Sequence, residues 1–125
     1  MRITVNTKGR WEWDPKEKGE PIQDNQKVVF TYNKPKSYKR SEWSRTCAVR
    51  QPNGSISTFI DRDVKAIILE SDVNIENLTV VENGVEKEIK TGVDLCDCVS
   101  DVTSMLVERL AYEITRNDYE GELKN

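Results

Sequence analysis

The sequence predicts an α+β domain in which two or three helices pack against an antiparallel sheet that includes Asn-Gly hairpins, with the C-terminal helix the longest. Three observations lead to this fold class. Residues 27–33, KVVFTYN, are rich in the β-branched and aromatic side chains that favour strands. Asn-Gly occurs at 53–54 and again at 83–84, each time between short apolar stretches, which is typical of a tight hairpin turn. Residues 95–116 repeat apolar side chains every three or four positions, as an amphipathic helix does.

Length and composition predict one cytoplasmic domain. The chain has 125 residues, of which 36% are hydrophobic and 33% charged, enough for one modest core. We expect the domain to span 1–116 and a mobile polar tail to occupy 117–125, where no apolar period remains. No apolar run approaches the roughly 20 residues of a membrane span, and the N-terminus lacks the apolar segment of a signal peptide.

The N-terminal region predicts a strand and then a loop. Alternation of Ile3 and Val5 with polar neighbours indicates a first strand at 2–6. Residues 8–26 hold glycines and prolines among many charges, which predicts an irregular loop. Within this loop, Trp11 and Trp13 would point to one side if the backbone were extended.

Two further helices are predicted in the middle of the chain. The segment 37–50 fits neither the helical nor the strand period, and we expect a short helix from Ser37 that runs into a strand at 47–50. The segment DRDVKAIILES predicts a second helix, which Asp61 is placed to cap.

The start of the C-terminal helix contains two closely spaced cysteines. Thr91 and Asp94 have the spacing of a capping box, which marks a helix that we expect to run to about Arg116. On such a helix Cys96 and Cys98 would point about 200° apart. They could then neither share a metal ion nor form a disulfide, and we interpret them as small buried hydrophobic residues.

The residue inventory argues against catalysis. The chain has no histidine, which removes the commonest general base and the commonest zinc ligand. Its three cysteines, an odd number, fit a reducing compartment. No phosphate-binding glycine pattern and no calcium-loop spacing occurs. We therefore expect a non-enzymatic protein with no catalytic residues, no metal and no cofactor.

Charge is distributed unevenly along the chain. Residues 33–60 contain six basic residues against one acid, whereas 61–125 contain sixteen acids against seven basic residues. This asymmetry suggests electrostatic complementarity, either within the fold or between copies. Aromatic residues alternate with the basic ones as on a nucleic-acid-binding surface. However, a pI near 5.1 argues against a dedicated nucleic-acid binder.

Several aromatic and apolar residues are candidates for contact with another protein. The apolar face of the predicted C-terminal helix is broader than packing on one sheet requires. Tryptophan is a common interface anchor, although packing over a sheet edge is the alternative for Trp11 and Trp13. The predicted partner-binding residues are Trp11, Trp13, Trp43, Met105, Val107, Ala111 and Tyr112.

The order of motifs in residues 27–125 is similar to that of a known family. The capped helix DRDVKAIILESDV leads to IENLTV and to an Asn-Gly hairpin ending in EIKTGVDL; the helix VTSMLVERLAYEITR and a final LKN follow. Upstream, VVFTYNKPKSYKRSEW has a Tyr-x-x-Pro segment followed by a charged helix. These features resemble the small tail assembly chaperones of long-tailed bacteriophages and prophages.

The resemblance implies a non-enzymatic protein of the host cell cytoplasm. Such proteins associate with one another and coat the long, apolar tape measure protein until polymerisation of the tail tube displaces them. One alternative is a structural virion subunit, such as a tail-completion or head–tail joining protein, which stays in the finished particle. Another is a nucleic-acid-binding phage regulator that uses the basic segment 34–50, whose retention on single strands would fall with salt.

Overall fold

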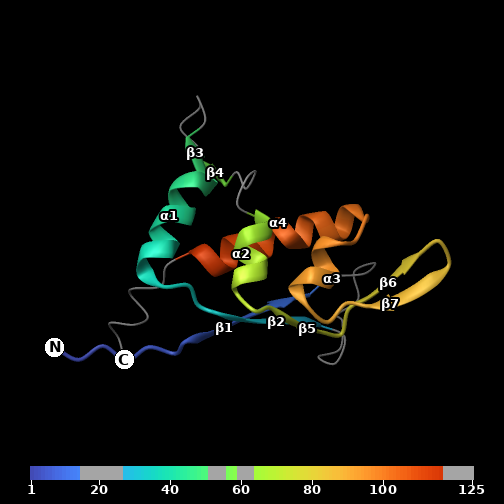
Figure 1. Ribbon diagram of the computed structural model, residues 1–125, viewed down its shortest axis with the longest axis horizontal. Helices are drawn as coiled ribbons and strands as arrows, with labels where there is room; N and C mark the ends of the chain where they lie inside the picture. The colour runs from blue at the N-terminus through green and yellow to red at the C-terminus, as the bar shows by residue number, and fades with distance from the viewer. Residues whose placement is uncertain (15–26, 51–55, 59–63, 117–125) are drawn as a thin grey trace.

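The computed structural model describes residues 1–14, 27–50, 56–58 and 64–116 (Figure 1). The elements in chain order are β1 Lys8–Trp13, β2 Val28–Asn33, α1 Ser37–Cys47, β3 Ala48–Arg50, β4 Ile56–Thr58, α2 Val64–Glu70, β5 Asn74–Glu76, β6 Thr79–Glu82, β7 Val85–Glu88, α3 Gly92–Cys96 and α4 Asp101–Thr115. The α+β class is confirmed, and α4 is the longest of the described helices.

The central sheet has three antiparallel strands in the order β1-β2-β5. β1 pairs with β2 over its whole length, from Lys8 opposite Asn33 to Trp13 opposite Val28. β5, which follows α2, pairs with the other edge of β2. The pairs β3–β4 and β6–β7 form separate two-stranded sheets. The hairpins therefore do not join the central sheet, contrary to the prediction of one sheet that contains them.

The first strand begins later than predicted. Residues 1–6 are exposed and form no strand, whereas β1 begins at Lys8, inside the segment 8–26 that was predicted to be an irregular loop. The reason is aromatic burial. Trp11 of β1 stacks on Phe30 of β2 with 4.9 Å between ring centroids, which stabilises this pairing more than burial of two isolated aliphatic side chains would.

Some predictions concern residues outside the described parts of the chain. These are the remainder of the loop at 15–26, the cap Asp61 and the polar tail at 117–125. The turn at 53–54 is also outside, but the strands on either side of it pair antiparallel, with Arg50 opposite Ile56, as a hairpin requires.

The short helix from Ser37 and the second Asn-Gly hairpin are confirmed. α1 begins at Ser37 and passes directly into β3, as predicted. Asn83 and Gly84 have φ angles of 52° and 80°, so both central residues of the β6–β7 turn have the positive φ that a type I′ turn needs. Asn tolerates this region better than most residues, and Gly adopts it without steric cost.

The predicted C-terminal helix is two helices. Thr91 and Asp94 form the expected capping box, but α3 ends at Cys96. Ser100 then caps α4, because its Oγ accepts hydrogen bonds from the backbone N–H groups of Val102 and Thr103. A serine side chain that satisfies the free N–H groups of a new helix competes with continuation of the preceding one. The predicted C-terminal end is confirmed, since α4 ends at Thr115.

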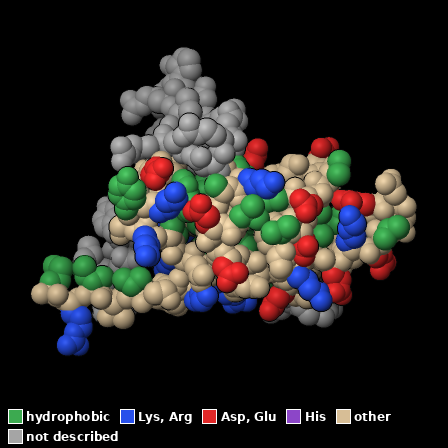
Figure 2. All heavy atoms as spheres, in the orientation of Figure 1, with side chains coloured by type: hydrophobic (Ala, Val, Ile, Leu, Met, Phe, Trp, Pro, Cys, Tyr) green, Lys and Arg blue, Asp and Glu red, His purple; other side chains and the backbone are tan. Residues whose placement is uncertain are grey.

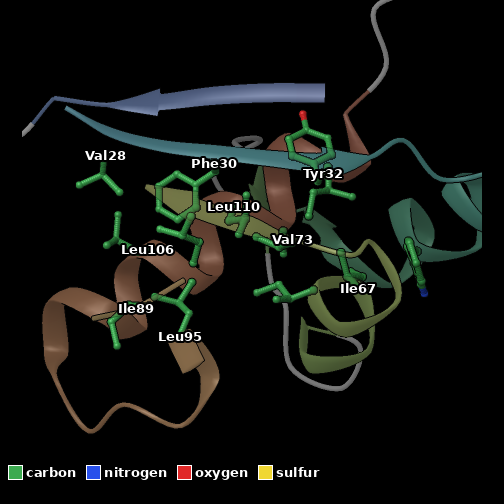
Figure 3. Close-up of a cluster of buried hydrophobic side chains, with 14 residues drawn as sticks. Val28, Phe30, Tyr32, Ile67, Val73, Ile89, Leu95, Leu106 and Leu110 are labelled. Carbon is green, nitrogen blue, oxygen red and sulfur yellow. The ribbon is translucent and has the colours of Figure 1, made fainter. Parts of the chain in front are cut away.

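The core lies between the central sheet and the helices on one of its faces. Figure 3 shows Phe30 of β2 next to Leu106 and Leu110 of α4. Tyr32 lies farther along β2, and its hydroxyl donates to the carbonyl oxygen of Glu113 in α4. Both leucines and Phe30 are fully buried. The remaining buried members of this cluster are Val28, Trp43, Ile67, Ile68, Val73, Ile75, Ile89, Leu95, Ala111 and Ile114.

We predict that Leu110→Ala lowers the free energy of unfolding by about 2–5 kcal/mol, because it leaves a cavity at a fully buried position. Leu69→Ala in α2 is the matched control, since Leu69 is exposed and the same atoms are removed. Urea denaturation followed by circular dichroism measures both. A loss at Leu110 no larger than that at Leu69 would contradict the described core.

Candidate partner-binding surface

Two of the predicted partner-binding residues are buried. Trp43 of α1 and Ala111 of α4 both belong to the core cluster. They are therefore not available on the surface, and their assignment as partner contacts is corrected. The broad apolar face of the helix has a simpler explanation than a partner, because α4 contacts α1, α2, α3 and β1 within the same chain.

The N-terminal tryptophans are also directed into the fold. Trp11 and Trp13 lie opposite Phe30 and Val28 in the register and pack against the core as partly buried residues. The guanidinium of Arg109 lies 5.1 Å from the ring centroid of Trp11 and covers it. Packing at a sheet edge, the alternative considered for these residues, is the arrangement observed.

The other three predicted contacts differ in exposure. Met105 and Val107 are partly buried and pack against the core, whereas Tyr112 is exposed. The structure therefore leaves only Tyr112 of the seven predicted residues with a largely accessible side chain. It does not bring the seven together into one surface.

The two C-terminal cysteines are free and partly buried. Cys96 is the last residue of α3, and Cys98 lies beyond it, with its Sγ donating to the carbonyl oxygen of Asp94 at 3.3 Å. Both pack against the core. Burial raises the pKa of each thiol, so both thiols stay protonated up to a higher pH than an exposed cysteine does. In the described residues, no group of three or more Cys, Asp or Glu is placed to hold a metal ion.

A groove that the sequence did not predict lies between β6 and the start of α4. Its volume is about 540 Å³, and its walls are Leu78–Asn83 on one side and Val99, Ser100, Val102 and Thr103 on the other. Valines around it are unusually exposed for their type: Val81 by 61%, Val85 by 60%, Val99 by 87% and Val102 by 49%.

One carboxylate holds the two walls of this groove together. Glu82 Oε1 accepts a hydrogen bond from the backbone N–H of Val99 at 3.2 Å, and its Oε2 accepts one from Lys87 Nζ at 3.1 Å. The hydrogen bonds from Lys87 and then from Val99 lower the pKa of Glu82. The carboxylate therefore stays charged at neutral pH and keeps both bonds.

Acidic side chains surround this end of the molecule. Figure 2 shows Asp and Glu, with basic side chains among them, over α3 and the β6–β7 hairpin, which projects away from the helices in Figure 1. Along the hairpin, Glu86 and Glu88 are exposed on β7. The hairpin that forms one wall of the groove therefore exposes carboxylates as well as valines, and we call Glu86 and Glu88 the acidic rim.

Comparisons of this chain with protein-family profiles, with curated proteins and with solved structures found no match. No described helix is both long enough and apolar enough to span a membrane.

A local signal could have located part of this groove. Ser100 followed by Asp101 is the pattern of an N-cap with an acidic first turn, and it marks a new helix. Recognising it would have removed Val99 from the predicted helical stripe and left it in a connection. The exposure of Val81 and Val85 has no such signal, because it depends on the hairpin projecting from the fold.

We predict that both C-terminal thiols react with a disulfide reagent several-fold more slowly in the folded protein than in urea at pH 8, because burial raises their pKa and limits access. A Cys47→Ser background leaves only these two thiols to report. The raised pKa favours the folded state below the ordinary thiol pKa, and this contribution is lost as the pH rises through the folded-state value. Equal rates in both states would contradict the described packing.

Proposed function

We propose that this protein is a non-enzymatic tail assembly chaperone of a bacteriophage or prophage, and that it binds the tape measure protein in the host cell cytoplasm during tail morphogenesis. The resemblance of residues 27–125 to that family suggests the class. The observation that carries the proposal is the groove between β6 and α4, with its exposed valines.

The groove suits an apolar helix better than a polar ligand. Burial of exposed valine side chains by a partner stabilises the complex by about 25 cal/mol for each Å² of apolar surface removed from water. A helix that lays an apolar stripe in a groove buries such surface along several turns. The tape measure protein of the resembled family is long and apolar, so it offers repeated stripes of this kind.

The acidic rim adds a requirement for the partner. Glu86 and Glu88 are exposed on β7, the strand that pairs with the β6 wall of the groove, and Glu88 also pairs with Lys90 at 3.0 Å. A segment with Lys or Arg flanking its apolar stripe would match this charge, whereas an acidic segment would be repelled. Since these charges are exposed, salt would weaken their attraction to the partner. Release of the tape measure protein during tube polymerisation would therefore not have to break a buried ion pair.

Affinity capture of the tagged protein from cells with an active phage or prophage tests this function. Mass spectrometry should identify a long helical tape measure protein in the captured material, and purified particles should lack this chain. Its presence in particles at a fixed stoichiometry would overturn the chaperone function in favour of a structural virion subunit.

We predict that Val99→Asp together with Val102→Asp reduces capture of the tape measure protein about tenfold or more. Burying an unpaired carboxylate costs more than the ~1.4 kcal/mol that tenfold requires. Val5→Asp is the matched control: Val5 is 49% exposed, and its segment lies at the opposite end of the molecule from the hairpin (Figure 1). Equal loss of capture in the control variant would show that the groove is not the binding site.

A further inference from the structure

A small pocket lies at the opposite end of the molecule from the groove, where three segments distant in sequence meet. The ends of β1 and β2, the helix α1 and the C-terminal turn of α4 form it, and its volume is about 160 Å³. The charged and phenolic residues that line it are Arg10, Tyr32, Lys34, Arg40, Glu113 and Arg116.

Positive charge in this pocket is in excess. Three cationic side chains share the pocket with one carboxylate: Lys34, Arg40 and Arg116. That carboxylate is already engaged, since Glu113 Oε2 lies 2.7 Å from Arg116 Nε. Arg10 also lines the pocket, but its side chain pairs with Glu12 at 2.8 Å on the exposed outer face of β1. The partial negative charge at the carbonyl end of α4 favours nearby cations, yet it amounts to only about half a charge.

Among the pocket residues, Arg40 points most directly to an anionic ligand. Its Nε is buried and has no hydrogen-bond partner. Among the described residues, no other buried side-chain nitrogen or oxygen lacks a partner. A buried charged donor without a partner is costly, and such groups are normally satisfied by protein, water or ligand. An anion in the pocket would supply the acceptor.

We propose that this pocket binds a phosphate group, with Arg40 as its principal ligand. A phosphate group has three acceptor oxygens and close to two negative charges, so it can bind several cations at once. A carboxylate is a less suitable ligand here, because one guanidinium is enough to pair with it. A volume of about 160 Å³ holds such a group and a few waters, each of which takes about 30 Å³ in the liquid. It is smaller than the roughly 300 Å³ of ordinary small-molecule pockets, so the rest of a larger ligand would lie outside.

Tyr32 forms a neutral wall of the pocket. An added Cβ at Gly9 would lie 2.2 Å from the Tyr32 ring, so only glycine lets this ring pack across β1. The phenol donates to the carbonyl oxygen of Glu113 at 3.3 Å. Burial, and then the charge of Glu113, raise the pKa of Tyr32, so the hydroxyl stays protonated and would not repel an anion.

The phosphate has two possible sources: free inorganic phosphate, or the backbone of a single-stranded nucleic acid. Both present non-bridging phosphate oxygens to Arg40, but a backbone phosphodiester offers two of them and one negative charge, whereas inorganic phosphate carries close to two charges. This inference does not depend on the proposed function, because the pocket and the valine groove lie at opposite ends of the molecule and share no residue.

The test is a ¹⁵N NMR titration of arginine Nε–H groups with inorganic phosphate at constant ionic strength, with chloride replaced stepwise. We predict that the Arg40 resonance, assigned by its loss in Arg40→Gln, shifts saturably with phosphate. Arg40→Gln should weaken phosphate binding about tenfold or more, as measured on backbone amide resonances, because it removes a charge-assisted hydrogen bond. Lys90→Gln makes the same charge change near the hairpin and should leave the affinity unchanged within about twofold.

Lys34→Gln guards against the possibility that Arg40→Gln does not fold, since Lys34 lines the same pocket from the chain after β2. It should also weaken phosphate binding while keeping the thermal unfolding transition. A single-stranded oligonucleotide without terminal phosphate is titrated in parallel. Binding of the oligonucleotide alone, sensitive to Arg40, would assign the site to backbone phosphate. No shift of the Arg40 resonance with either ligand, or equal weakening by Lys90→Gln, would overturn the proposal.

Discussion

The burial of Phe30 at the centre of β2 is the contact on which the other elements depend. Its ring stacks on Trp11 of the neighbouring strand and meets Leu106 and Leu110 of α4 on the side of the helices. On the other edge of β2 its backbone pairs with Ile75 of β5. One residue thus joins the N-terminal strand, the middle of the chain and the C-terminal helix, and a fully buried aromatic residue is among the largest single contributions to a core of this size.

This central packing also determines where the two candidate binding features lie. Because β1 is aligned on β2, Gly9 comes under the Tyr32 ring, and the ends of both strands meet α1 and the last turn of α4. Because α4 is held across the sheet, its first turn lies next to β6 instead of continuing α3. The two features are therefore at opposite ends of the same helix, one apolar with an acidic rim and one basic. A single chain could engage an apolar partner and an anion at the same time without steric conflict between them.

The element types were largely predictable from the sequence, whereas the surface was not. The strand over Val28–Asn33, the type I′ turn at Asn83 and the capping box at Thr91 each have a signal contained within a few residues. Two of the candidate contacts are buried for a common reason. Aromatic and apolar side chains such as Trp43 and Ala111 favour interfaces and cores equally, and only the packing of distant elements distinguishes the two.

Local sequence is enough to specify the α+β class, the second hairpin turn, the helix starts at Ser37 and Thr91 and the end of α4, because steric preference, capping and periodicity act over one or two turns of chain. The packing of distant segments selects which N-terminal segment pairs with β2, which valines stay exposed and which cations lie around Arg40. Those outcomes depend on burial and charge shared between segments far apart in sequence, and no local pattern encodes which distant surface a residue will meet.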